Sequence, residues 1–363
     1  MGFSLEPTDE QRALKETLHE FAEEILRPRA REAESARRVP DDIVAQAHEI
    51  GITAPVAQEY GGGGTLDAVT YCIAAEELGW GDAGIGYQLF GSGLAAVVIA
   101  EAGEDHTKTR YLPVFAQEPA RSFVALGEKF AGGDLETLAT SIDGDKVSGE
   151  KYGVLNPTDA TVGVVVGRDT EGLRAVVIAG DSDYEVVKPE DKLGLEAAPT
   201  SVVRFDGIGE ALEPGPGLEK AILWGKLLIG ALAVGSARAS FEYAAQYATE
   251  REAFGKPIGA FQGISFKIAD MAIEVDAARL SVLRAAWKLD RGDATLSDVA
   301  EAVGQALTSA IRCGDDGVQV LGGHGYIRDH PVEMWFRNAV TLSVFDAPDV
   351  LGDAMVARSV AAG

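Results

Sequence analysis

The stretch Arg251-Glu252-Ala253-Phe254-Gly255-Lys256-Pro257-Ile258 lies between two long segments of helical character. Before it, residues 218–251 contain no proline and are apolar around much of their circumference, which is typical of a helix buried within a bundle. After it, residues 261–289 carry apolar side chains at helical spacing. Two further helical segments are expected at 297–320 and 350–361, so the chain is predicted to end in a four-helix bundle.

The residues that precede this bundle differ from it in composition and pattern. From 122 to 213, short segments rich in valine and threonine alternate with turn signals. Asp143-Gly144 is a typical hairpin dipeptide, and residues 162–166 and 173–178 are candidates for buried strands. This part of the chain is predicted to form a β-barrel or β-sandwich domain.

Helical spacing also marks the beginning of the chain. Apolar residues recur on one face across 14–25, and Thr8 with Gln11 forms a candidate capping box in front of them. Pro28 is expected to interrupt this helix. The sequence therefore predicts an N-terminal α-helical domain (1–119), a middle β-domain (120–213) and a C-terminal α-helical bundle domain (214–363).

The composition excludes several classes of partner. The net charge of −25 disfavours nucleic acid and anionic membrane surfaces, because both attract basic faces. Cys72 and Cys313 are far apart and form no spaced cluster, so we expect no disulfide framework, no metal site and a reducing, cytoplasmic environment. The uncharged run 83–100 is broken by glycines, and a membrane span needs about 20 apolar residues, so a buried segment is expected there.

Several motifs occur in an order that is shared with one enzyme family. They are the stretch at 251–258, Phe261-Gln262, Gln319-Val320-Leu321-Gly322-Gly323-His324-Gly325-Tyr326, Asp191-Lys192-Leu193-Gly194-Leu195 and Glu59-Tyr60-Gly61-Gly62. With the α, β, α order, they make the chain resemble the acyl-CoA dehydrogenases over nearly its whole length. The resemblance implies an enzyme that uses FAD to desaturate the α,β bond of an acyl-CoA thioester.

One group of these motifs resembles a surface for the pyrophosphate and adenine half of FAD. In the family, such residues contact an FAD that is held mainly by the neighbouring subunit. Arginine offers two donors to phosphate oxygens, and glycines let backbone N–H groups approach a phosphate. Taken alone, Arg251 could equally be a cation at a helix C-terminus. The resemblance implies these cofactor-binding residues: Arg251, Phe254, Gln262, Gln319, Gly322 and Gly323.

The other half of the family site, which holds the flavin ring, departs from the pattern. Where the family has hydroxyl side chains after the first strand of the β-domain, this chain has Gly127 and Gly133. Where the family places an aromatic ring and a threonine against the flavin, the chain has Gly153 and Leu155. A register shift of one residue would instead bring Tyr152 to the position of the ring.

The position of the family's catalytic glutamate is occupied by Asp346. An aspartate could serve as the base if burial raises its pKa, but its carboxylate is retracted by roughly 1 Å, which can cost on the order of 10²-fold in rate. Pro348 also removes a hydroxyl and a backbone N–H from the flavin side. Nitroalkane oxidases, which resemble the family, pair an aspartate base with an arginine seven residues later, where this chain has Asp353. A purely structural Asp346 is the competing interpretation.

Other family members carry the glutamate on the long bundle helix, where this chain has Gly225 followed by Lys226. Losses confined to one half of the site favour a hetero-oligomer, in which this chain completes the FAD site of a homologous subunit that supplies the flavin pocket and the catalytic glutamate. Such complexes resemble the actinobacterial heterotetramers that oxidise steroid side-chain CoA esters, and an electron-transfer flavoprotein would be the acceptor. The alternatives are a homotetrameric enzyme that uses Asp346 and a non-enzymatic, flavin-free acyl-CoA-binding homologue.

Overall fold

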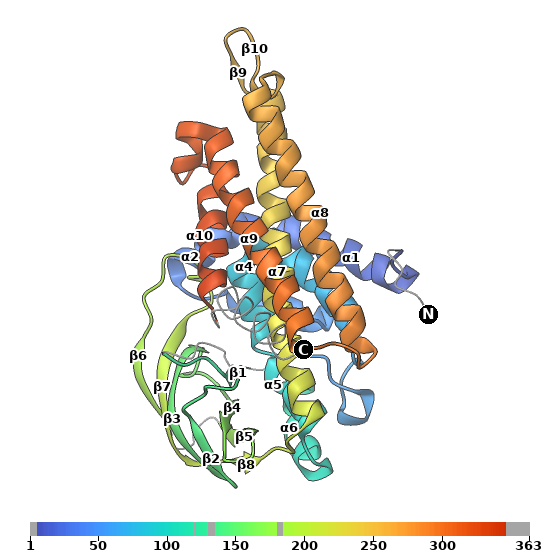
Figure 1. Cartoon of the computed structure of the whole chain (residues 1–363), viewed down its shortest axis with the longest axis vertical. Coiled ribbons are helices and arrows are strands. Elements are labelled where there is room, and N and C mark those ends of the chain that lie inside the picture. Colours follow the sequence, from blue (N-terminus) through green and yellow to red (C-terminus); the bar gives the residue numbers. More distant parts are fainter. Residues whose placement is uncertain (1–5, 120, 130–134, 180–183, 346–363) are drawn as a thin grey trace, which may run out of the picture.

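The computed structural model describes residues 6–119, 121–129, 135–179 and 184–345, and it contains helices, then a sheet, then long helices (Figure 1). This arrangement confirms the predicted α, β, α architecture. The N-terminal elements are α1 (Asp9–Phe21), a π-helical turn η1 (Ala22–Leu26), α2 (Arg27–Ala36), α3 (Asp41–Ile50), a 3-10 turn η2 (Gln58–Tyr60), α4 (Ala68–Gly91), α5 (Leu94–Ala102) and α6 (Asp105–Gln117).

The first helix begins as the sequence predicts. The N–H of Gln11 donates to Thr8 Oγ1 at 3.2 Å, and the N–H of Thr8 donates to Gln11 Oε1 at 3.0 Å. Pro28 does not interrupt the helical path, contrary to the prediction. It lies in the first turn of α2, directly after η1, where the Arg27 N–H already bonds to the more distant Ala22 carbonyl. A proline is tolerated where the helical bonding pattern changes, because its missing N–H leaves no regular bond unmade.

The middle part is one eight-stranded sheet with the order β6-β7-β3-β2-β4-β5-β8, and β1 pairs with β4 in parallel. The predicted hairpin joins β2 to β3, with Gly144 at a φ of 58°. The predicted buried strands are confirmed as β4 and β5. The strands are β1 (Ser122–Ala125), β2 (Ser141–Asp143), β3 (Lys146–Leu155), β4 (Val162–Arg168), β5 (Leu173–Ala179), β6 (Tyr184–Pro189), β7 (Thr200–Ile208) and β8 (Glu210–Ala211).

The C-terminal part contains three of the long helices predicted from the sequence and a shorter fourth one; the predicted segment 350–361 lies outside the described residues. The elements are α7 (Pro216–Glu250), β9 (Glu252–Ala253), β10 (Lys256–Pro257), a 3-10 turn η3 (Ile258–Ala260), α8 (Gln262–Asp290), α9 (Leu296–Leu321), a 3-10 turn η4 (Gly322–Tyr326) and α10 (Val332–Val344).

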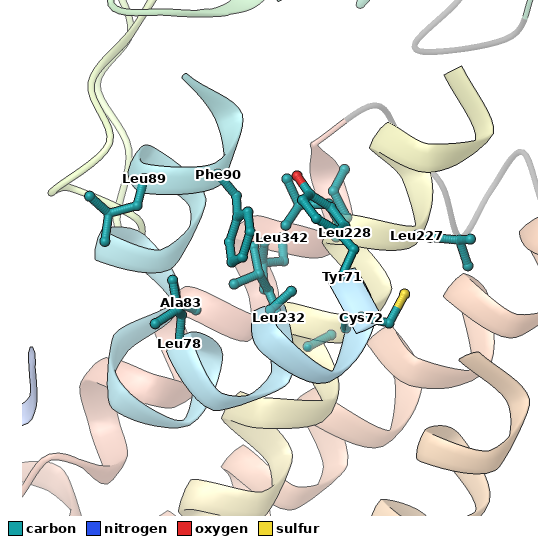
Figure 2. Close-up of a cluster of buried hydrophobic side chains, with 14 of the residues drawn as sticks. Tyr71, Cys72, Leu78, Ala83, Leu89, Phe90, Leu227, Leu228, Leu232 and Leu342 are labelled. Atoms are coloured by element: carbon teal, nitrogen blue, oxygen red, sulfur yellow. The ribbon is translucent and has the colours of Figure 1, made fainter. Parts of the chain in front are cut away.

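The central core forms where α4 packs against α7. Figure 2 shows Tyr71 and Phe90 of α4 beside Leu228 of α7, within one cluster of buried apolar side chains. Glycines let the two backbones approach closely: a Cβ at Gly79 would lie 2.4 Å from the Leu232 carbonyl oxygen. Two helical stretches, 68–102 and 216–250, are long and apolar enough to cross a membrane, but 83% and 89% of their most apolar windows are buried inside the protein, as in core helices.

Buried charges also join α7 to α4. Arg238 donates to Glu76 at 2.7 Å and to Glu77 at 2.6 Å, and Arg279 of α8 donates to Glu76 at 2.8 Å. Burial alone would raise the pKa of Glu77, but the hydrogen bonds and charge of Arg238 hold it below its usual value. The network therefore fixes the spacing of three long helices with paired charges.

Candidate functional site

A tight hairpin projects from one end of the helical bundle (Figure 1). Its strands β9 and β10 pair with Lys256 opposite Ala253, and the turn residues Phe254 and Gly255 have φ values of 54° and 80°. Turns with two positive φ values favour Asn and Gly, so a phenylalanine there is strained. The Phe254 side chain is 96% exposed, and its ring meets that of Phe261 edge-on at 6.2 Å. An exposed ring on a strained backbone suggests a binding role rather than packing within this chain.

Two of the predicted cofactor-binding residues flank the hairpin. Arg251 follows the last turn of α7; its N–H donates to the Tyr247 carbonyl at 2.9 Å, and its own carbonyl accepts from the Ile258 N–H at 2.8 Å. The Arg251 side chain is exposed and forms no ion pair with the residues that the structure describes. Gln262 is the exposed first residue of α8. Both polar groups are therefore open to a ligand.

The remaining predicted residues lie at the end of α9, on the same end of the bundle. Gln319 is exposed, and Gly322, with a φ of 58°, turns the chain from α9 into η4. A Cβ at Gly322 or Gly323 would meet no atom within 4 Å, so the backbone there is open to approach. The hydroxyl of Tyr247 and Nδ1 of His324, 2.8 Å apart, tie η4 to α7. The structure thus brings the six predicted residues to one exposed end, which we call the bundle tip: Arg251, Phe254, Gln262, Gln319, Gly322 and Gly323.

A cavity of about 770 Å³ lies elsewhere, between the sheet, α5, α7 and α10. None of the six bundle-tip residues lines it. Its helical wall is mainly apolar, with Leu94 and Val98 from α5, Ile222 and Ile229 from α7, and Val344 from α10. The size and apolar lining are typical of a small-molecule site.

Two of the positions where the sequence departs from the family line this cavity, namely Gly127 and Gly153. The pairing of β3 with β7 shifts register between Lys151 and Val154, and Gly153 adopts a φ of 68° inside this bulge. A Cβ at Gly153 would lie at an ordinary contact distance of 3.7 Å from the Phe345 ring, so a larger side chain is disfavoured there by backbone strain rather than by lack of space.

Two nearby positions of β3, Tyr152 and Leu155, differ in their surroundings. Tyr152 also lines the cavity, and its hydroxyl donates to Glu150 at 2.9 Å on the same strand. Leu155 does not line the cavity: its side chain is buried in the core of the sheet. The structure therefore brings residues 127, 152 and 153 together at the cavity and leaves residue 155 apart.

A buried ion pair at the cavity was missed in the sequence. Lys151 is fully buried and donates to Glu128 at 2.7 Å and to the Leu126 carbonyl at 3.0 Å. Glu128 also accepts the N–H groups of Ala139 and Thr140. Burial alone would raise the pKa of Glu128, but Lys151 and these N–H donors hold it below its usual value. Only the fold brings the segment after β1 to the middle of β3, so no local motif encodes this contact.

The other carboxylates of the cavity wall are engaged as well. Glu190 accepts the N–H of Gly153 at 3.1 Å, and Asp191 pairs with Arg37 at 2.9 Å. Within the described ranges, each lining carboxylate therefore has a hydrogen-bond or ion-pair partner. The predicted catalytic residue Asp346 lies outside the described residues, as do Gly133 and Pro348.

Three lysines line the cavity, and Lys188 is the exposed one. Lys192 donates to the Ala198 carbonyl at 2.8 Å and to Thr200 Oγ1 at 3.1 Å, and burial lowers its pKa to about 8. Lys226 lies on α7 beside Gly225 and is only 4% exposed. A Cβ at Gly225 would lie 3.7 Å from Leu94, so the cavity has ordinary packing space at this position.

Comparisons with known proteins agree along the chain. Residues 8–119 match the family model for the acyl-CoA dehydrogenase N-terminal domain, and residues 218–360 match that for the C-terminal domain. The chain is 30% identical to the probable acyl-CoA dehydrogenase YngJ of Bacillus subtilis, over 99% of this chain and 100% of that protein. It superposes on butyryl-CoA dehydrogenase from Megasphaera elsdenii with a TM-score of 0.88 and 27% identity, covering 99% and 100% of the two chains. A structure described as an electron transferring flavoprotein of Acidaminococcus fermentans gives a TM-score of 0.89 and 28% identity over 99% of both chains.

Proposed function

The chain belongs to the acyl-CoA dehydrogenase family, whose members are FAD-dependent oxidoreductases, and we propose that it is the FAD-completing, catalytically weak or inactive subunit of a heteromeric member. The observation that carries this proposal is the contrast between the two halves of the site. The six bundle-tip residues keep their exposed side chains and open backbone and lie outside the chain's own cavity, whereas that cavity has glycines at two of the flavin positions.

The bundle tip fits the pyrophosphate and adenine half of FAD bound to another subunit. Arg251 offers a planar fork to phosphate oxygens, and its exposed guanidinium has no competing carboxylate among the described residues. Gly322 and Gly323 leave the backbone open, so N–H groups can approach a phosphate. Phe254 supplies an exposed ring for packing against the partner or the cofactor.

The cavity fits the flavin half less well. Gly127 and Gly153 provide neither a hydroxyl nor a ring, and Leu155 is buried elsewhere. Tyr152 is the aromatic residue next to these positions in the cavity wall, and its hydroxyl already donates to Glu150. Glu128, one of the lining carboxylates, is paired with Lys151, which helps to hold its pKa below the usual value, so it is poorly suited to take up a proton. These features support a partner subunit that provides the flavin pocket and the base.

The reaction is then the α,β-desaturation of an acyl-CoA thioester. FAD, when bound, would supply the acceptor for the hydride of the β-carbon, and a carboxylate of the partner would serve as the base for the α-proton. This chain contributes binding and orientation through its bundle tip. By analogy with heteromeric relatives, the substrates are steroid side-chain CoA esters, and an electron-transfer flavoprotein accepts the electrons.

A homotetrameric enzyme with Asp346 as its base is the second candidate. The observation in its favour is that the cavity of about 770 Å³ persists in this chain and is large enough for a cofactor. The two candidates differ in the number of FAD molecules per chain.

Replacing Arg251 tests the proposal directly. Arg251→Ala in the complex of this chain with a homologous subunit should abolish FAD retention on gel filtration without lowering the thermal stability of the chain, because the guanidinium is exposed. Arg284→Ala removes an equally exposed arginine from the side of α8 and should leave FAD in place. Retention of FAD by the Arg251 variant at the wild-type ratio would contradict the proposed role.

A further inference from the structure

Lys226 is a buried cation in an apolar wall. It lies on α7 one helical turn from Ile222 and close to one turn from Ile229, and all three line the cavity. The residue is only 4% exposed, and it lines the cavity. Burying a charged ammonium without a partner is costly, and proteins retain such groups mainly where a ligand or a function requires them.

No hydrogen bond or ion pair reaches Lys226 from the part of the chain that the structure describes. The carboxylates of the cavity wall are directed elsewhere: Glu128 pairs with Lys151, Asp191 pairs with Arg37, and Glu190 accepts a backbone N–H. Of the other two lining lysines, Lys192 already donates to the Ala198 carbonyl and to Thr200 Oγ1, and Lys188 is exposed. Lys226 is therefore the buried cation that remains available to an anion entering the cavity.

The surroundings of Lys226 define the rest of the ligand. Leu94 and Val98 of α5, Ile222 and Ile229 of α7 and Val344 of α10 provide an apolar wall around it. Gly225, the residue before Lys226, also lines the cavity and adds no side chain to it. Such a chamber suits a ligand with an apolar body and a single anionic group that reaches the lysine.

We propose that the cavity of this chain binds an apolar carboxylate, with its anionic group paired to the ammonium of Lys226. Two sources share this chemistry: a free carboxylic acid with an aliphatic or fused-ring body, and an acyl-CoA whose acyl group ends in a second carboxylate. The inference rests on the proposed function in one respect only, namely that the chain's own cavity holds no flavin. A subunit whose bundle tip binds the FAD of a partner has its own cavity free for such a ligand.

The test is a calorimetric titration of the assembled full-length complex with dodecanoate, and with dodecan-1-ol as the neutral probe. Lys226→Met should weaken dodecanoate binding by about 10- to 100-fold, because a hydrogen bond to a charged group is lost, and leave dodecanol binding unchanged. Lys226→Arg should restore binding to within a few-fold. Lys188→Met, which removes an exposed lysine from the same cavity, is the matched control and should have no effect.

Two thioesters distinguish the sources of the carboxylate. If the ligand is an acyl-CoA, the mono-CoA thioester of dodecanedioate should bind more tightly than dodecanoyl-CoA, and Lys226→Met should erase the difference. If the ligand is a free acid, the two thioesters should bind alike and only dodecanoate should respond to the substitution.

Two outcomes overturn the inference. One is equal affinity of the wild type and Lys226→Met for every carboxylate probe. The other is an equal loss of thermal stability in unliganded Lys226→Met and in Asp346→Asn. Equal losses would mean that the ammonium pairs with this carboxylate of the chain itself. Neither outcome depends on the FAD content of the complex. That content is measured separately and tests the proposed function.

Discussion

Lys151 Nζ lies 2.7 Å from Glu128 Oε1, so the carboxylate beside Gly127 in the cavity wall is held as part of a buried ion pair. Removing one partner of such a pair leaves the other charge buried without a partner, which typically destabilises a protein by about 3–5 kcal/mol. We therefore expect Lys151→Met to lower the free energy of unfolding by an amount in that range, measured by urea denaturation. Lys188→Met, on the exposed edge of the same cavity, should change stability by less than about 0.5 kcal/mol. An unchanged midpoint for Lys151→Met would show that Glu128 is stabilised in another way.

Gly323 tests whether the open backbone of the bundle tip serves a ligand. A Cβ there meets no atom within 4 Å, so Gly323→Val should leave the fold and stability of the chain unchanged. The same substitution should reduce FAD retention in the complex, because the added side chain blocks approach to the backbone. Gly304 of α9 has equal space, and Gly304→Val should leave the FAD content unaltered. Full FAD retention by the Gly323 variant would remove this segment from the binding surface.

Asp346→Asn distinguishes the two candidate functions. If a partner supplies the base, turnover of an acyl-CoA substrate by the complex should fall by less than about twofold, whereas loss of a working base typically costs about 10²–10⁴-fold. The assay is the rate of substrate-dependent flavin bleaching under anaerobic conditions. A loss of that larger size would identify Asp346 as the base.

Asp82 should give the chain a distinctive dependence on pH. It is buried at a non-helical position inside α4, accepts the Ile85 N–H at 2.8 Å and accepts from Asn338 Nδ2 at 3.1 Å. Burial raises its pKa to about 6, above the value of about 3.9 expected in the unfolded chain. A raised folded-state pKa means that the protonated form stabilises the fold. The contribution of Asp82 is therefore fully present below about pH 4 and is lost as the pH rises through about 6.

The difference in unfolding free energy between the wild type and Asp82→Asn should accordingly change between pH 4 and pH 6.5 and level off above it. Thermal melts at closely spaced pH values give this difference curve. A flat difference across the range would mean that Asp82 titrates near its ordinary pKa.

Local patterns were sufficient to predict much of the fold. The capping box of Thr8 and Gln11, the hairpin at Asp143-Gly144 and the helix that became α7 depend on residues close together in sequence, and the structure confirms them. The glycines of α7 do not end the helix, because some of them serve close packing against α4. A Cβ at Gly235, for example, would lie 2.1 Å from the Glu76 carbonyl oxygen of α4. The domain boundaries after residues 119 and 213 remain predictions.

Features that depend on distant contacts were not predictable. The pair of Glu128 and Lys151 exists only because the segment after β1 meets the middle of β3, and the helical path through Pro28 depends on the π-helical turn before it. The strained, exposed Phe254 could have been suspected from its place before Gly255, since a two-residue turn there requires positive φ at both positions.

The central claim is that FAD is shared between this chain and a homologous partner. The most direct measurement is the visible spectrum of the protein, purified alone and with a co-expressed homologue, combined with the subunit ratio from native mass spectrometry. The account predicts no flavin on the chain alone and one FAD for each pair of unlike subunits in the complex. One FAD per chain in a complex of identical subunits would contradict it.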